Sequence, residues 1–134
     1  TGELLPVKDT PFDFNKRKRI GQDLEADHIQ LKNAFGYDHS FVLNGTENQL
    51  TLEEPVSGRR LVISTTAPVV QVYTGNFLKD GCIGKAGRVY ENREGVALET
   101  QLMPNAINTE KNPSTILRKG DKFESNTKYV FEIM

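Results

Sequence analysis

Short runs of β-branched and aromatic residues, separated by turn-forming residues, recur along the whole chain. Several of these runs alternate apolar and polar positions with period two, which is typical of half-buried β-strands. We predict six strands on this basis, in the segments 40–43, 49–54, 59–65, 69–75, 95–101 and 128–134. Because turn residues separate the runs at short intervals, the pattern predicts an all-β, antiparallel architecture.

Helical spacing is found in the segment 20–33. Apolar residues and one histidine recur there at intervals of three and four positions, namely Ile20, Leu24, His28 and Leu31. This spacing predicts a short surface helix or a turn. Farther along, Asn44-Gly45 lies between the first two predicted strands. Because both residue types readily adopt positive φ values, this pair predicts a tight hairpin.

Long irregular connections separate some of the predicted strands. Residues 74–95 and 101–127 are rich in glycine, asparagine and proline. Long structured loops on a β scaffold are commonly functional surfaces. The sequence has no internal repeat and no low-complexity linker, so it predicts one domain, or part of one, with no internal boundary.

Composition excludes several classes of partner. The 134 residues are 37% hydrophobic and 26% charged, which fits a globular domain or a piece of a larger one. A net charge of -1 gives no general attraction to nucleic acid or to an anionic membrane. The basic run at residues 15–19 has no interleaved aromatic residues and fits a solvated turn. No apolar run approaches the ~20 residues of a membrane span, so we predict neither a nucleic-acid partner nor a membrane partner.

The few cysteine and histidine residues limit redox and metal chemistry. A single cysteine, Cys82, excludes an internal disulfide, and it has no obvious base nearby in sequence that would make it a nucleophile. This cysteine usage predicts a reducing cytoplasm, although a disulfide-free secreted protein would have the same composition. The pairs Asp27-His28 and Asp38-His39 lack a third and fourth ligand at suitable spacing, so we predict no metal site.

Three polar positions interrupt apolar context and are the candidate binding residues. Asp38 lies at the entry to a strand, Gln71 lies inside VVQVYTG, and Glu99 lies inside VALETQ. Glutamate is uncommon inside strands, and a half-buried carboxylate carries a desolvation cost unless a partner or a function compensates for it. Two acids and an amide could line one polar groove for a polyhydroxylated ligand such as a sugar. The same residues also fit hydrogen-bonded polar groups with a purely structural role.

Five sequence motifs resemble, in this order and spacing, the C-terminal portion of the aldose 1-epimerase family, whose members are also called galactose mutarotases. The motifs are TPFDF, GYDHSFVL, VQVYTGNFL, ALETQLMPNAIN and ILRKGDKFESNTKYVF, and together they cover nearly the whole chain. The resemblance implies a large antiparallel β-sandwich, of which residues 1–134 would form the C-terminal part. It also implies an isomerase that interconverts the α and β anomers of galactose, glucose and similar free hexoses without a cofactor.

The resemblance further implies roles for the three candidate residues. In the family, the glutamate of the motif matched by LETQ is the general base, which gives that role to Glu99. The aspartate of the motif matched by GYDH contacts sugar hydroxyls and corresponds to Asp38. The family also has a glutamine at the sugar, with one residue between it and the motif YTGNF. This glutamine corresponds to Gln71.

The family's catalytic acid, a histidine, has no counterpart among these residues. A substrate-binding arginine and a second histidine of the family are also missing, and neither His28 nor His39 matches the acid. We therefore expect this chain to be the C-terminal part of a single catalytic domain, to need the N-terminal part as its partner, and to be inactive alone. Strands that would pair with that part should leave an exposed sheet edge.

Two other functions are compatible with the residues. A non-catalytic sugar-binding module could use the same groove and would bind both anomers without exchanging them. A glycoside hydrolase could use Asp38 and Glu99 as its two carboxylates, at a separation of ~5 to 5.5 Å for a retaining enzyme or ~6.5 to 9.5 Å for an inverting one.

Overall fold

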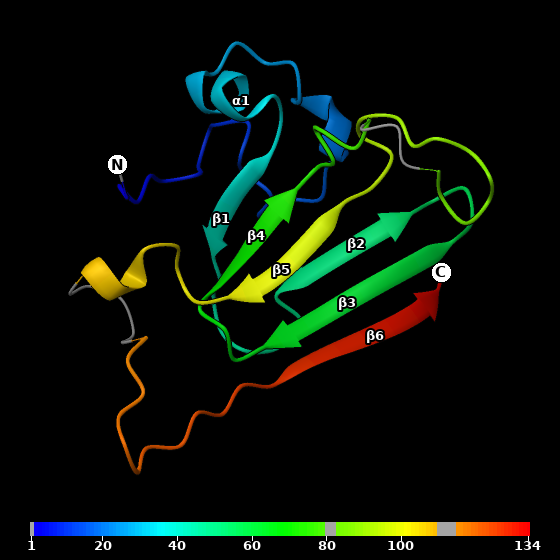
Figure 1. Ribbon diagram of the computed structural model, residues 1–134. Helices are drawn as coiled ribbons and strands as arrows, with labels where there is room; N and C mark the ends of the chain where they lie inside the picture. The colour runs from blue at the N-terminus through cyan, green and yellow to red at the C-terminus, as the bar shows by residue number, and fades with distance from the viewer. Residues whose placement is uncertain (1, 80–82, 110–114) are drawn as a thin grey trace. The chain divides into compact units, whose positions relative to one another are not determined.

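Six strands form the framework of the described part of the chain (Figure 1). The structure, a computed structural model, describes residues 2–79, 83–109 and 115–134. Each strand overlaps a predicted segment, so all six predicted strands are confirmed: β1 (Asp38–Val42), β2 (Leu50–Glu54), β3 (Arg59–Thr65), β4 (Val69–Tyr73), β5 (Ala97–Gln101) and β6 (Thr127–Ile133).

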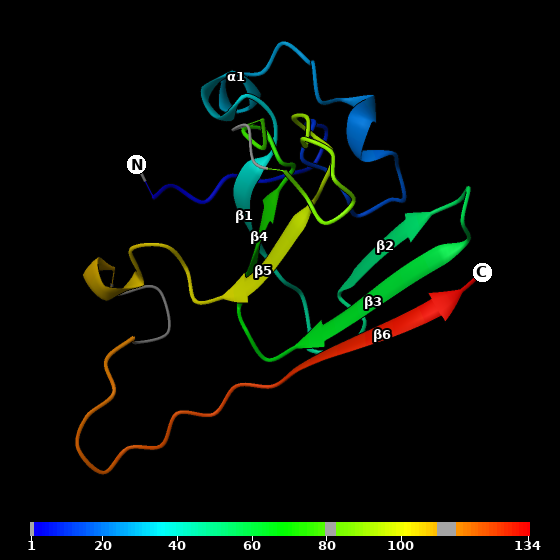
Figure 2. The ribbon, with the colours of Figure 1, turned by 45° about the vertical axis from the view of Figure 1, so that its right-hand side comes forward.

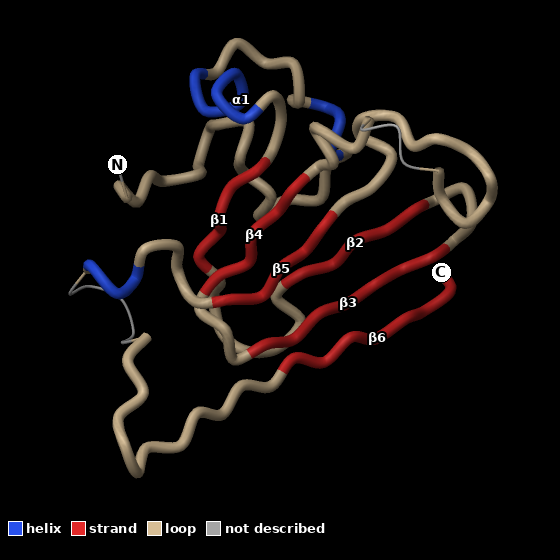
Figure 3. Tube along the Cα trace, viewed as in Figure 1, coloured by secondary structure: helices blue, strands red, loops and turns tan. Residues whose placement is uncertain are grey.

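The strands form two three-stranded sheets, in the orders β1-β4-β5 and β2-β3-β6 (Figure 3). In the second sheet, β3 pairs antiparallel with β2 on one side and with β6 on the other. In the first sheet, the arrows of β1 and β5 run opposite to that of β4 in both Figure 1 and Figure 2. The predicted all-β, antiparallel architecture is therefore confirmed.

The predicted hairpin between the first two strands is wrong. Strand β1 belongs to one sheet and β2 to the other, although Gly45 does adopt a φ of +73°. The hairpin forms instead between β2 and β3, where Gly58 has a φ of +74°. The Glu54 carboxylate accepts hydrogen bonds from the N–H groups of Val56 (2.8 Å) and Ser57 (2.7 Å), which closes that turn.

Helices are few and short. The predicted helical segment contains a 3-10 turn, η1 (Ile20–Gln22), and one α-helix, α1 (Ile29–Ala34), so the prediction of a short helix is confirmed for its second half alone. A further 3-10 turn, η2 (Ala106–Asn108), follows β5. In α1 the buried residue is Leu31. Within the part of the chain that the structure describes, no helix is long and apolar enough to cross a membrane.

The chain divides into two compact units. The first comprises Thr1–His39 and Val72–Leu98, and the second comprises Ser40–Gln71 and Glu99–Met134. The largest fully buried side chain of the first unit is Tyr37. In the second unit, the largest fully buried side chains are the β-branched residues Ile63, Val69 and Val70, which suit the pleated surface of a sheet.

Aromatic rings build the core of the first unit around Tyr37 and Phe12. The ring of Phe12 meets that of Tyr37 edge-on at 5.4 Å between centroids, and it also meets the rings of His28 (5.2 Å) and His39 (4.7 Å). Phe14 meets Tyr37 at 5.3 Å. Edge-to-face contacts of this kind add to the free energy gained from apolar burial.

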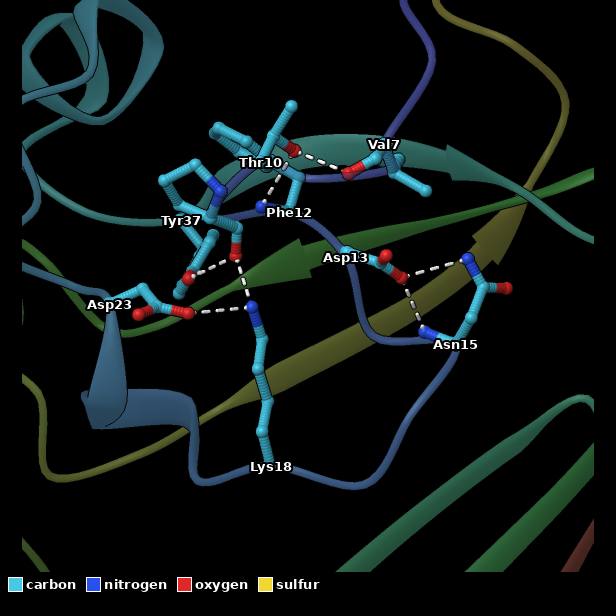
Figure 4. A network of polar contacts seen from close by, with 9 residues as sticks. Val7, Thr10, Phe12, Asp13, Asn15, Lys18, Asp23 and Tyr37 are labelled. Carbon is cyan, nitrogen blue, oxygen red and sulfur yellow. Dashed lines mark hydrogen bonds and ion pairs between the residues drawn. The ribbon is translucent and has the colours of Figure 1, made fainter.

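A polar network links this aromatic core to the N-terminal segment (Figure 4). The Tyr37 hydroxyl donates to the carbonyl oxygen of Pro11 (2.7 Å), and Lys18 Nζ donates to the same oxygen (2.6 Å). Lys18 Nζ also pairs with Asp23 (2.8 Å) and lies 4.5 Å from the centroid of the Phe14 ring. Lys18 is therefore part of the core rather than of a solvated basic turn, which corrects the interpretation of residues 15–19 at this position.

Burial and the charge of Asp23 raise the pKa of Tyr37 to about 12, so the phenol stays a hydrogen-bond donor at neutral pH. We expect Tyr37→Phe to lower the free energy of unfolding by about 1 kcal/mol, because the bond to Pro11 is lost inside the core. Urea denaturation measures this change. Tyr129→Phe removes a hydroxyl from a 47% exposed side chain and serves as the control, and an equal loss in both variants would contradict the role given to the Tyr37 hydroxyl.

Candidate functional site

The three candidate residues lie on the three strands of one sheet. Asp38 is the first residue of β1, Gln71 is the central residue of β4, and Glu99 is the central residue of β5, in a sheet ordered β1-β4-β5. Asp38 and Glu99 are exposed, whereas Gln71 is partly buried. That the three side chains line a single groove stays a prediction.

Glu99 differs from the sequence-based expectation in its burial. The carboxylate was expected to be half-buried, but the residue is exposed, so it keeps its hydration and carries no large desolvation cost. Among the described residues, the side-chain carboxylate of Glu99 has no hydrogen-bond or ion-pair partner.

Threonine hydroxyls fix the strand segment that carries Glu99. The hydroxyl of Thr100 lies 3.2 Å from that of Thr127 at the start of β6, and Thr127 in turn lies 2.8 Å from the hydroxyl of Thr65 at the end of β3. Glu99 and the three threonines, Thr65, Thr100 and Thr127, all belong to the second unit. The residue next to the candidate base is therefore tied to the sheet β2-β3-β6.

Ser40 fixes the side chain of Gln71. The Ser40 hydroxyl donates to Gln71 Oε1, which requires the amide nitrogen to point the other way. A backbone hydrogen bond from Leu43 to Pro68 (3.0 Å) holds the same two chain segments together. Sequence reasoning missed Ser40, although a signal existed, since it lies two residues after Asp38 and so on the same side of β1.

A buried network of hydrogen bonds positions the residue before Asp38. Tyr37 N–H donates to Thr74 Oγ1 (3.1 Å), and Thr74 N–H donates to the Tyr37 carbonyl (3.0 Å). The Asn76 amide donates to the carbonyls of Tyr37 (3.0 Å) and Ala34 (2.8 Å) and accepts from the Thr74 hydroxyl (2.7 Å). The motifs GYDH and YTGNF are thus held together, and the network sets where β1 begins.

Two glycines lie where a side chain would not fit, and the first of them allows this close approach. Gly36 has a φ of +139°, and a Cβ there would lie 2.4 Å from Asn76 Oδ1. Gly75 has a φ of +65°, and a Cβ there would lie 2.8 Å from the carbonyl oxygen of Gly95. A side chain at Gly36 would strain the backbone and displace the Asn76 amide, whereas one at Gly75 would strain the backbone and clash with Leu78 and the carbonyl of Gly95.

Arg93 anchors the long connection between β4 and β5. Its backbone N–H donates to the carbonyl of Gly75 (2.7 Å), and its guanidinium donates to the carbonyl of Phe35 (3.1 Å) and pairs with Glu25. The described part of this connection is therefore tied to the end of α1. Cys82, which lies in the same connection, is outside the described residues.

Asn76→Ala should lower the free energy of unfolding by about 1 to 3 kcal/mol, because it removes the amide that donates to the carbonyl of Ala34 and one of the hydrogen bonds to the buried carbonyl of Tyr37. Thermal or urea denaturation measures the loss. Asn33, on the exposed side of α1, is the matched control, and Asn33→Ala should change stability by less than about 0.5 kcal/mol. Equal free energies of unfolding for Asn76→Ala and Asn33→Ala would contradict the structural role given to the network.

Both histidines have structural contacts in the first unit. His28 Nδ1 accepts from the N–H of Gln30 (3.2 Å) and caps α1. His39 Nδ1 accepts from the N–H of Asp38 (3.0 Å), and its ring packs against Phe12. Within the described residues, no three histidine, cysteine, aspartate or glutamate side chains form a group that could hold a metal ion.

Burial lowers the pKa of His39, against the opposing effect of the Asp38 charge, and His28 lowers it further. The unfolded chain therefore binds a proton more readily than the folded one, so stability is full above the ordinary pKa of histidine and declines as the pH falls below it. We expect a lower urea midpoint at about pH 5.5 than at about pH 7.5. His39→Gln should flatten this dependence, and an unchanged slope in that variant would contradict the assignment.

Comparisons with known proteins agree with this architecture. The family model for aldose 1-epimerase matches residues 1–130. Galactose mutarotase from Homo sapiens is 38% identical over 99% of this chain, and aldose 1-epimerase from Escherichia coli (strain K12) is 34% identical over 96% of it. The chain spans 38% of the length of each of these relatives.

Solved structures show the same fold. An aldose epimerase homologue from C. elegans superimposes with a TM-score of 0.85 and 30% identity, covering 99% of this chain and 40% of that one. Galactose 1-epimerase from Lactobacillus acidophilus superimposes with a TM-score of 0.68 and 28% identity, covering 96% of this chain and 37% of that one. The chain is thus an all-β protein of the galactose mutarotase-like fold. It belongs to the aldose 1-epimerase family, which confirms the resemblance found in its sequence motifs.

Proposed function

We propose that this chain provides the general base and part of the sugar contacts of an aldose 1-epimerase, an isomerase of free hexoses such as galactose and glucose. The observation that carries the proposal is the family match over residues 1–130, which includes the strand with Glu99. Relatives named galactose mutarotase and aldose 1-epimerase support the reaction class. The proposed reaction uses no cofactor and no metal.

Anomer exchange requires two proton transfers that proceed together. A base removes the proton of the anomeric hydroxyl while an acid protonates the ring oxygen, and the bond between the anomeric carbon and the ring oxygen breaks. The open aldehyde then rotates by half a turn about its bond to the neighbouring carbon. Closure reverses both proton transfers and leaves the opposite anomer, so one base and one acid are sufficient.

Glu99 suits the role of the base, and Asp38 and Gln71 suit the role of sugar ligands. The Glu99 carboxylate is exposed and has no partner among the described residues, so a sugar hydroxyl can reach it. Carboxylates accept hydrogen bonds from the hydroxyl groups of a sugar. An amide nitrogen donates hydrogen bonds to the oxygen atoms of those hydroxyl groups. The hydrogen bond from Ser40 holds the oxygen of the Gln71 amide in one orientation on β4.

The acid of the proposed reaction comes from outside these residues. His28 caps α1, and His39 packs under Phe12, so both rings are engaged in the first unit. We propose that the 134 residues correspond to the C-terminal part of a single aldose 1-epimerase domain. The span of 38% of the relatives' length supports this, and alone the chain should leave anomerisation at its spontaneous rate.

A chimera tests the proposal. This chain would replace the portion that it matches in Homo sapiens galactose mutarotase, and polarimetry would follow freshly dissolved α-glucose and α-galactose. We expect acceleration by the chimera, and we expect Glu99→Gln to reduce it by about 100-fold or more, because the amide cannot accept the anomeric proton.

Glu124→Gln is the control, since Glu124 is an exposed glutamate paired with Lys122. This variant should keep the full rate. A rate of Glu99→Gln close to that of the control would remove Glu99 from the base role. A folded chimera that binds galactose without exchanging its anomers would indicate a sugar-binding module, and release of sugar from a glycoside would indicate a hydrolase.

A further inference from the structure

The hydroxyl of Ser40 contacts the side chain of Gln71, which is one of the three candidate sugar contacts. Ser40 is the central residue of β1 and Gln71 is the central residue of β4, and these strands are neighbours in the sheet β1-β4-β5. Both residues are partly buried, and both belong to the second unit. The contact therefore lies within a single compact unit.

The register of the two strands places Ser40 and Gln71 directly opposite one another. Two backbone hydrogen bonds of 3.0 Å flank this pair, namely Leu43 N–H to the Pro68 carbonyl and Thr74 N–H to the Tyr37 carbonyl. In an antiparallel pair, each step forward on one strand is a step back on the other, so three steps inward from either bond lead to the same two residues. Opposite side chains share one face of the sheet, with Cβ atoms about 4.5 to 5.5 Å apart.

The hydrogen bond from Ser40 restricts the side chain of Gln71. Glutamine is among the residues that lose most rotamer freedom when they become ordered. Because the Ser40 hydroxyl donates to Gln71 Oε1, the oxygen end of the amide is held against β1. A side chain that is already ordered loses less conformational entropy when a ligand binds to it. The contact with Ser40 therefore prepares the Gln71 amide for a ligand.

The backbone under Gln71 is fixed as well. Val69 and Val70, the two residues before it on β4, are fully buried. Strand β4 lies between β1 and β5 in the sheet order, so it has a neighbour on each side. Movement at Gln71 is therefore largely movement of its side chain, which is the part that Ser40 holds.

We propose that Ser40 is a positioning residue for sugar binding, which holds the Gln71 amide so that its nitrogen is presented to a sugar hydroxyl. The inference rests on the proposed function, because it takes Gln71 as a sugar contact. It adds that the affinity for the sugar depends on Ser40, which acts through its neighbour. The proton transfer proposed for Glu99 does not depend on this hydroxyl.

The chimera with Homo sapiens galactose mutarotase provides the test. Polarimetry gives KM and kcat for galactose, and titration calorimetry gives the dissociation constant of galactose whether or not its anomers exchange. Ser40→Ala should raise both KM and the dissociation constant about 5- to 10-fold, because the amide is no longer held for binding. It should leave kcat within about 2-fold of the wild type, since the substitution removes binding free energy and not a group that transfers protons.

Two further variants separate positioning from a purely structural role. Ser64 is the matched control, because it is a strand serine with 8% exposure whose hydroxyl accepts from the N–H of Asn48 (2.9 Å). Ser64→Ala should lower the free energy of unfolding and leave KM unchanged. Ser40→Thr retains a hydroxyl and should keep KM within about 2-fold of the wild type.

A double-mutant cycle tests whether Ser40 acts through Gln71. In a chimera that already carries Gln71→Ala, the substitution Ser40→Ala should not raise the dissociation constant of galactose any further. Independent effects of the two substitutions would contradict the inference. An unchanged dissociation constant in Ser40→Ala, or an equal rise of KM in Ser64→Ala, would also contradict it.

The same measurements distinguish this inference from the proposed function. An active chimera whose affinity for galactose is indifferent to Ser40→Ala would contradict the inference alone. A chimera that binds galactose with the expected dependence on Ser40, but leaves its anomers at the spontaneous rate, would contradict the proposed function alone. A folded chimera that does not bind galactose would contradict both.

Discussion

The hydrogen bonds that join Asn76 and Thr74 to Tyr37 are the constraint on which the first unit depends. They satisfy backbone groups of Tyr37 that are fully buried and would otherwise carry a desolvation cost. These hydrogen bonds bring the Asn76 side chain so close to the backbone at Gly36 that a Cβ there would clash with it. This explains why a glycine lies between the end of α1 and the start of β1. Asp38 follows directly, so a candidate ligand for sugar hydroxyls occupies a position that the core determines.

The sequence predicted the strands well and their pairing poorly, for one physical reason. Alternation of apolar and polar residues is local, so residues 59–65 and 69–75 could be recognised as strands from their own composition. Pairing depends on residues far apart in the chain. Asn44-Gly45 favours a turn, and Gly45 does adopt positive φ, but β1 pairs with β4 because the Asn76 network brings their ends together. No local pattern contains that information.

The identities of the residues predict the candidate site, but they do not predict the burial of its side chains or their hydrogen-bond partners. The sequence predicts a half-buried glutamate at Glu99; the structure places Glu99 in the predicted strand but exposes it, so the prediction of its burial is wrong. Ser40 and Thr74 were missed because a hydroxyl in a strand is unremarkable until its partner is known. Lys18 looked like part of a solvated basic run, but a carbonyl, a carboxylate and an aromatic ring bind it.

In the second unit, the strand segment that carries the candidate base is linked to β6 through one side chain. Thr127 begins β6, and its hydroxyl contacts both Thr65 on β3 and Thr100, the neighbour of Glu99 on β5. The pairing of β6 with β3 therefore positions Thr127, and through it the strand segment that carries Glu99. Because a proton-transferring group must hold its position to within a fraction of an ångström, the base role proposed for Glu99 depends on the hydroxyl contacts that tie Thr100 to Thr127 and Thr127 to Thr65.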